Sequence, residues 1–173
     1  MTMQVAILAA GMGTRLGRPW PKPLTQLHDG RSIMGQQREN IAAVFGPQAR
    51  VMTVVGFKLE SILEAFPDGL FVYNENFDTT NTCKSLLKAL QLSGEGPVLW
   101  MNGDVVFDPE VLRRLESNIL RGDNVICVNT SAVAEEEVKY TVDADGFVDE
   151  LSKTVQNALG EAVGINLVSG RDK

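Results

Sequence analysis

The sequence has few of the residues on which several common site chemistries depend. Its 173 residues include one histidine, His28, and two cysteines, Cys83 and Cys127. A single histidine excludes a metal site built from several histidines, and a Ser-His-Asp triad would depend on His28 alone. The cysteines form no C-x-x-C pair and no disulfide framework, which favours a reducing compartment and ordinary buried, apolar roles for both.

Long apolar runs are also absent. None approaches the roughly 20 residues that a membrane-spanning helix needs. The first apolar run, residues 5–10, is too short for a signal peptide and has no basic segment before it. With 44% hydrophobic and 22% charged residues, the composition is that of a globular chain rather than a disordered one. We therefore expect a cytoplasmic protein with a single domain over residues 1–173 that does not bind membranes.

Negative charge is scarce in the first third of the chain, although the formal net charge is −6. Residues 1–59 contain seven basic and two acidic side chains, whereas residues 60–173 contain nine basic and twenty acidic ones. A locally cationic segment in an acidic protein suits a small anionic ligand, and extended nucleic acid would favour a broader basic face. Chance clustering on a solvated surface is the alternative interpretation.

Apolar runs alternate with helical patterns along the chain. This alternation predicts an α/β fold with a Rossmann-like, mixed but mainly parallel sheet and helices on both of its faces. Strands are predicted at residues 4–9, 51–55, 70–73, 98–101, 125–128, 138–142, 147–151 and 162–168, and helices at 33–45, 58–66, 81–92 and 109–120. Ligands of such sheets bind beyond the carboxyl ends of the strands. Two motifs fall there: a glycine-rich segment after the first strand and Asp104 after the fourth.

The glycine-rich segment, Gly11-Met12-Gly13-Thr14-Arg15, allows a ligand to approach the backbone closely. It is not a dinucleotide fingerprint, which requires glycine where this chain has Leu16, and it is not a P-loop. Lys22, followed by Pro23 and Leu24, lies seven residues after Arg15. A guanidinium and an ammonium on a proline-stiffened loop can hold a polyphosphate.

Residues 8–24, LAAGMGTRLGRPWPKPL, resemble the signature of nucleotidyltransferases that join an NTP to a phosphorylated small molecule. This family includes sugar-1-phosphate nucleotidylyltransferases, cytidylyltransferases and molybdenum-cofactor transferases. Residues 100–112, WMNGDVVFDPEVL, resemble its second block, in which an aspartate at a strand end holds Mg²⁺. The resemblance implies that Arg15, Lys22 and Asp104 carry the catalysis and that Asp104 is the metal ligand. It also implies nucleotide-binding roles for Leu8, Ala9, Ala10, Gly11, Gly13, Thr14, Arg15, Lys22 and Gly103.

Two shorter stretches are similar to cytidylyltransferases. One runs from Tyr73-Asn74-Glu75-Asn76 through Asn81 to Ser85, and the other is Glu161-Ala162-Val163-Gly164-Ile165. The first is similar to those that act on phosphocholine, 2-aminoethylphosphonate or inositol phosphate, and the second to the phosphocholine and 2-aminoethylphosphonate members. The similarity implies CTP as the nucleotide, a small phosphorylated or phosphonate acceptor, and acceptor contacts from Asn81, Ser85, Lys153 and Glu161. Those relatives often have two asparagines where this chain has Asn81-Thr82, which leaves the acceptor open. Asn81 can equally serve as the N-cap of its helix, and Lys153 and Glu161 can be ordinary surface residues.

Two rival functions stay open. One is a sugar-1-phosphate nucleotidylyltransferase using UTP, dTTP or GTP, and the other is a nucleotide-binding domain without chemistry. The family pattern usually continues beyond the strand that ends near Val168, with a second metal-binding aspartate and a helix that covers the sheet. We therefore expect a form truncated at its carboxyl end that binds nucleotide, has little activity, exposes apolar surface at its last strand and self-associates into homo-oligomers.

Overall fold

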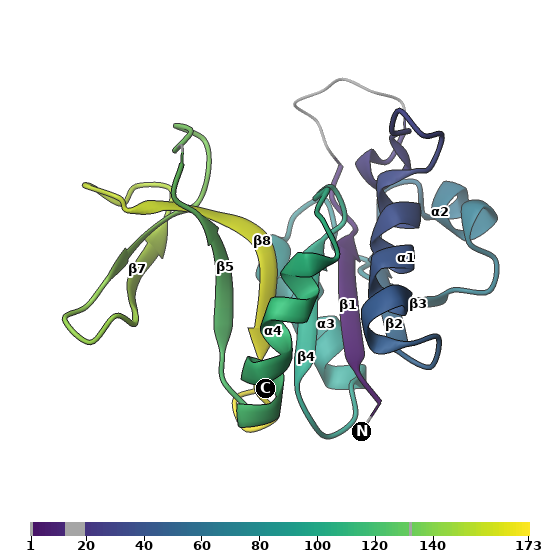
Figure 1. Cartoon of the computed structure of the whole chain (residues 1–173). Helices are drawn as coiled ribbons and strands as arrows, with labels where there is room; N and C mark the ends of the chain where they lie inside the picture. Colours follow the sequence, from purple (N-terminus) through teal and green to yellow (C-terminus); the bar gives the residue numbers. More distant parts are fainter. Residues whose placement is uncertain (1, 13–19, 132) are drawn as a thin grey trace.

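The computed structural model describes residues 2–12, 20–131 and 133–173. This part of the chain contains one eight-stranded sheet (Figure 1). β1 (Gln4–Ala9) lies between β2 (Arg50–Val55) and β4 (Val98–Asn102), and β3 (Leu70–Tyr73) is the edge strand beside β2; these four strands are parallel. β8 (Gly160–Val168) is antiparallel to β4, to β5 (Val125–Asn129) and to β6 (Lys139–Val142). β7 (Val148–Ser152) pairs antiparallel with β6 at the other edge. Among the described strands, β1 to β6 therefore run in one direction and β7 and β8 in the other, which confirms the predicted mixed, mainly parallel sheet.

Helices cover both faces of the sheet, as predicted. Side chains alternate along β1, so Val5 and Ile7 join the larger apolar cluster while Ala6 joins the smaller one on the opposite face. The larger cluster includes apolar residues of α1 (Ile33–Phe45), α2 (Leu59–Ala65) and α4 (Glu110–Arg121). α3 (Thr82–Leu92) packs on the other side and contributes Ala89. Figure 1 shows α1 and α4 in front of the parallel strands and α3 behind them.

Local sequence signals account for where these elements begin and end. The Ser32 hydroxyl accepts a hydrogen bond from the Gly35 amide at 3.0 Å, which caps α1, and Gly46 ends that helix with φ +82°. The Asp108 carboxylate accepts from the Glu110 amide at 2.8 Å at the start of α4. In the β6–β7 turn, the Asp143 carboxylate accepts from two backbone amides of the turn at 2.9 Å each. Each of these hydrogen bonds joins residues no more than four positions apart, so these helix starts and this turn are set by local sequence.

Two sequence expectations were wrong. Cys83 is exposed on the first turn of α3, because that position faces away from the sheet, whereas Cys127 is partly buried and burial raises the pKa of its thiol. The last strand does not expose its apolar side chains. Ile165 and Leu167 of β8 are each 1% exposed because they share the cluster with Leu112 and Leu115 of α4.

Exposed apolar side chains gather instead at the β6–β7 hairpin and beside it, at Val142, Phe147, Val148, Leu151 and Leu159. Within the described part of the chain, no helix is long and apolar enough to cross a membrane.

Candidate active site

A cleft of about 740 Å³ lies at the carboxyl ends of β1 and β4. Its walls include the first turn of α3, the turn after β4 and the amino-terminal half of β8. The predicted site residues that line it are Leu8, Ala9, Ala10, Gly11, Lys22, Asn81, Ser85, Asp104, Lys153 and Glu161. The structure thus brings these ten predicted residues together in one cleft, at the edge of the sheet where ligands of parallel α/β folds bind.

Three predicted residues, Gly13, Thr14 and Arg15, lie outside the described residues. Gly103 is described but is not among the residues that line the cleft. Its amide donates a hydrogen bond to the Leu8 carbonyl at 2.9 Å, and a Cβ at this position would lie 2.8 Å from Cγ of Pro23. Gly103 therefore allows the segment that carries Lys22 to pack closely against the end of β4.

Lys22 and Asp104 form the charged centre of the cleft. Lys22 begins the short 3₁₀ helix η2 (Lys22–Leu24), which the buried ring of Pro23 anchors, and its Nζ lies 3.2 Å from Oδ2 of Asp104. The two side chains are 32% and 42% exposed, so the ion pair remains open to solvent and ligands. A partly exposed pair of this kind contributes little net free energy, which leaves both charges available to an incoming ligand.

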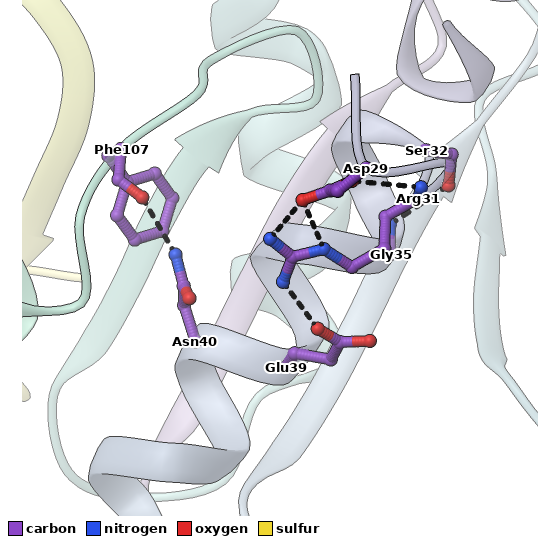
Figure 2. Close-up of polar contacts among 7 residues, drawn as sticks. All are labelled: Asp29, Arg31, Ser32, Gly35, Glu39, Asn40 and Phe107. Carbon is purple, nitrogen blue, oxygen red and sulfur yellow. Dashed lines mark hydrogen bonds and ion pairs between the residues drawn. The ribbon is translucent and has the colours of Figure 1, made fainter. Parts of the chain in front are cut away.

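Two amides on α1, which the sequence interpretation missed, hold the segment after β4. Gln37 is fully buried, and its Nε2 donates to the carbonyls of Asn102 at 2.9 Å and Val105 at 2.8 Å. One turn further along α1, Nδ2 of Asn40 donates to the Phe107 carbonyl at 2.8 Å (Figure 2). Their position in the sequence could have indicated this role, because both amides lie on the apolar face of α1 rather than on its polar face.

The loop before α1 is organised by a charged cluster (Figure 2). The Arg31 guanidinium donates to Asp29 at 2.5 and 2.9 Å and to Glu39 at 2.6 Å. The guanidinium of Arg31 lowers the pKa of Asp29, and the two carboxylates raise the pKa of Arg31. The Ile33 amide donates to the Thr25 carbonyl at 3.0 Å, so the start of α1 is also tied to the residue that follows η2.

Asn74, another buried amide, orders the wall of the cleft near α3. It is 1% exposed, and its Nδ2 donates to the hydroxyls of Thr80 at 3.1 Å and Ser85 at 3.0 Å. Thr80 donates its own hydroxyl hydrogen to the Asn76 carbonyl at 2.6 Å. Because the Ser85 oxygen accepts from Asn74, its hydrogen can be donated to a ligand. Asn81 occupies the N-cap position of α3, but its side chain caps no backbone amide there and lines the cleft.

The end of the cleft near β8 is rich in carboxylates. Glu161 is partly buried, and its carboxylate accepts from the Ala134 amide at 3.0 Å and from Nδ2 of Asn129 at 3.5 Å. These donors are neutral, so they orient the carboxylate without neutralising its charge. Nζ of Lys153 lies 3.8 Å from a carboxylate oxygen of Glu136, which also lines the cleft. Tyr140, on the neighbouring strand β6, is only 7% exposed and does not line the cleft.

Comparison with known proteins identifies a family for this chain. The family model described as "MobA-like NTP transferase domain" matches residues 5–164. Among curated proteins, the chain is similar to the CMP-5′-(3-aminopropyl)phosphonate synthase of Streptomyces rubellomurinus, with 38% identity over 122 residues. That alignment covers 65% of this chain and 19% of the relative. The chain is also similar to the bifunctional protein GlmU of Cyanothece sp., with 33% identity over 147 residues that cover 82% of this chain and 32% of the relative.

Solved structures share the fold at lower sequence identity. The inositol-1-phosphate CTP transferase from T. maritima superposes with a TM-score of 0.75 and 16% identity, covering 98% of this chain and 71% of that one. HddC from Yersinia pseudotuberculosis gives a TM-score of 0.76 and 17% identity, covering 98% and 78%. The chain belongs to the MobA-like NTP transferase family. It spans between about a fifth and a third of the length of the two curated relatives described above.

Proposed function

We propose that this chain transfers a nucleotidyl group, CMP from CTP, to a small phosphorylated or phosphonate acceptor that carries an ammonium group. The observation that carries the proposal is the cleft itself. It joins a lysine–aspartate pair at the glycine-rich end of β1 to Glu161 on β8, a carboxylate that accepts hydrogen bonds from the neutral Ala134 amide and Asn129 side chain. The match to the family model and the similarity to a CMP-aminopropylphosphonate synthase support the same reaction class.

In the proposed reaction, an oxygen of the acceptor attacks the α-phosphorus of CTP. A new phosphorus–oxygen bond forms, the bond between the α-phosphorus and the bridging oxygen breaks, and pyrophosphate leaves with that electron pair. The attacking oxygen is already anionic, so the chain needs no general base. Its tasks are to bring two anions together in line and to offset their charge. Lys22 supplies a positive charge in the described part of the cleft, and we assign a second to Arg15.

The donor set of the cleft fits Mg²⁺. Asp104 offers a carboxylate that is 42% exposed and lines the cleft, and within the described residues no three His, Cys, Asp or Glu side chains group to hold a metal ion by themselves. One carboxylate together with substrate phosphates is a common way of holding Mg²⁺. Bound there, the ion would offset charge on the phosphate oxygens. We assign Asp104 as its protein ligand.

The acceptor's ammonium group would face Glu161. A carboxylate oriented by neutral donors keeps its charge for a cationic ligand, and the neighbouring Glu136 and Glu137 add to the negative potential. We assign Lys153 and the hydroxyl of Ser85 to the acceptor's phosphate or phosphonate oxygens. A neutral sugar phosphate would leave the Glu161 carboxylate without a counter-charge, and for this reason we favour an amino acceptor.

The test is a matrix of CTP, UTP, dTTP and GTP against phosphocholine, 2-aminoethylphosphonate and glucose 1-phosphate, measured as pyrophosphate release. Calorimetry should measure binding of each NTP in parallel. We expect release with CTP and an amino acceptor, and loss of release in Asp104→Asn. The matched control is Asp108→Asn, since Asp108 lies four residues later in the same loop and caps α4 outside the cleft.

Each other outcome identifies a rival. Release with glucose 1-phosphate but not with the amino acceptors would make the protein a sugar-1-phosphate nucleotidylyltransferase. Tight binding of CTP without release for any acceptor would leave a nucleotide-binding domain without chemistry. Equal activity in the two aspartate variants would remove Asp104 from the site.

A further inference from the structure

The turn that carries Asp104 has few hydrogen bonds of its own. Asp104 lies in a four-residue turn, from Asn102 to Val105, that joins β4 to the segment before α4. Within this turn, the Val105 amide donates to the Asn102 carbonyl over a long 3.4 Å. A turn closed by one long hydrogen bond does not by itself fix the direction of its carboxylate.

Gln37 bridges the two ends of this turn. Its Nε2 donates to the carbonyls of Asn102 and Val105, at 2.9 and 2.8 Å, which are the residues on either side of Gly103-Asp104. The side chain is fully buried on α1, a thirteen-residue helix packed against the sheet, so the bridge has a rigid base. Both hydrogens of the amide are used for this bridge, while its Oε1 has no hydrogen-bond partner within the described part of the chain. A buried acceptor without a hydrogen-bond partner destabilises the fold, and the two hydrogen bonds that Nε2 donates offset part of this free-energy penalty.

The same helix is connected to Lys22. The first amide of α1 donates to Thr25, directly after η2, and the turn around Gly103 packs on Pro23 of η2. Helix α1 therefore contacts both segments that carry the charged pair. Lys22 and Asp104, 3.2 Å apart, thus lie on two segments that both contact α1.

We propose that Gln37 is a positioning residue that sets the place of the Asp104 carboxylate relative to Lys22 by bridging the Asn102 and Val105 carbonyls. Its effect on turnover rests on the proposed nucleotidyl transfer; its effect on the turn does not. A displacement of about 1 Å at a reacting centre can cost about 100-fold in rate, and loss of a residue that orients a metal ligand typically costs 10- to 100-fold.

The decisive variant is Gln37→Met, which keeps the length of the side chain and removes both donors. The chain contains a matched control in Gln4. That glutamine is also buried, and its Nε2 also donates to two loop carbonyls, of Gly94 and Glu95, at 3.2 and 3.0 Å. Gln4 lies at the start of β1, at the opposite end of the strand from the cleft. Gln4→Met therefore removes a similar amide bridge from a loop that carries none of the candidate site residues.

The first measurement is amide hydrogen exchange by NMR, which needs no ligand and no activity. In Gln37→Met we expect exchange at Gly103 and Val105 to accelerate at least tenfold, with Gly94 unchanged. In Gln4→Met we expect the reverse, because the Gly94 amide donates to Oε1 of Gln4. Unchanged exchange at Gly103 and Val105 in Gln37→Met, or equal acceleration there in both variants, would overturn the proposal.

The second measurement is turnover in the assay described above. We expect Gln37→Met to lower kcat about 10- to 100-fold with the KM for the acceptor changed less than threefold, and Gln4→Met to leave both unchanged. Wild-type kcat in a folded Gln37→Met protein would also overturn the proposal. If the wild type releases no pyrophosphate while exchange at Gly103 and Val105 still accelerates, the proposed function fails and the positioning role stands.

A second variant covers the case in which Gln37→Met does not fold. Asn40→Leu removes the neighbouring bond to the Phe107 carbonyl and leaves the Gln37 bridge intact. In Asn40→Leu we expect the amides that follow Val105 to exchange faster than in the wild type, and the Gly103 amide to exchange at its wild-type rate. Acceleration at Gly103 in Asn40→Leu equal to that at Val105 would show that the whole segment, rather than the Gln37 bridge, holds Asp104, and would overturn the assignment.

Discussion

Replacement of Lys22 by methionine separates the catalytic effect of its charge from the structural effect. The substitution keeps most of the aliphatic stem and removes the ammonium that lies 3.2 Å from Asp104. In water, two unit charges at that distance attract by about 1.3 kcal/mol. Because the side chains are 32% and 42% exposed, ordering costs and solvent screening reduce the net effect to about 0.2–1 kcal/mol.

The expected loss of turnover is larger. Removing one preorganised group that stabilises charge in the transition state costs about 100- to 1,000-fold in kcat, or roughly 2.7–4 kcal/mol. Lys22→Met should thus lower kcat by at least about 100-fold and the free energy of unfolding by less than about 1 kcal/mol. Pyrophosphate release measures the first quantity, and urea denaturation followed by tryptophan fluorescence measures the second.

Lys88→Met is the control, since Lys88 forms a 2.7 Å ion pair with Glu75 on the surface and does not line the cleft. It should leave turnover unchanged. The reasoning is refuted if Lys22→Met retains wild-type kcat, or if Lys88→Met loses as much. A large loss of stability in Lys22→Met would show that the pair is a structural bond rather than an open, ligand-accessible one.

Three further changes test other parts of the argument. Gly103→Ala should destabilise the fold by about 1–3 kcal/mol in urea denaturation, since the new Cβ would lie 2.8 Å from Cγ of buried Pro23. Glu161→Gln should raise the KM for a cationic acceptor at least tenfold and leave that for CTP unchanged, whereas Glu150→Gln on exposed β7 should change neither. Arg31 lowers the pKa of Asp29, so the Asp29 carboxylate contributes stability that is present above the ordinary aspartate pKa and is lost as pH falls through the lowered pKa. In Asp29→Asn, the urea midpoint of unfolding should therefore fall less steeply over this acid pH range than in the wild type.

Each of these has a clear contrary result. A Gly103→Ala protein as stable as the wild type would mean that η2 can move away from β4 at no cost. If Glu161→Gln raised the KM for CTP as much as the KM for the cationic acceptor, Glu161 would maintain the shape of the cleft and would not bind the acceptor's ammonium group. An unchanged dependence of stability on acid pH in Asp29→Asn would show that the pKa of Asp29 is the same in the folded and unfolded chains, so that the ion pair with Arg31 adds no pH-dependent stability.

Much of the architecture was predictable because its signals are local. The apolar run of residues 4–9 predicted β1, and the structure confirms it. The Ser32 cap, the glycine that ends α1 and the Asp143 turn likewise depend on residues close together in the sequence. Most of the candidate site was predictable for a similar reason. Motifs that follow parallel strands meet at one edge of the sheet, so Gly11 and Asp104 were expected there and both line the cleft.

Contacts between distant segments were not predictable. Gln37 is 65 residues from Asn102, and no spacing rule along a helix indicates that a buried amide bridges two carbonyls of a remote turn. Asn74 resembled a family motif in sequence, but its role as donor to Thr80 and Ser85 required the turn before α3 to fold back. Coverage of β8 by α4 likewise depends on which helix lies over that face of the sheet, which strand periodicity does not decide.

The sequence by itself determined the order of strands and helices, their caps, and which motifs would lie at the carboxyl edge of the sheet, because propensity, hydrophobic period and parallel topology act through short-range or repetitive rules. Only the tertiary structure decided that Lys22 meets Asp104 at 3.2 Å, and that Glu161 is held by neutral donors at the far end of the same cleft. These arrangements depend on packing between segments tens of residues apart, where a shift of one ångström changes which charges meet.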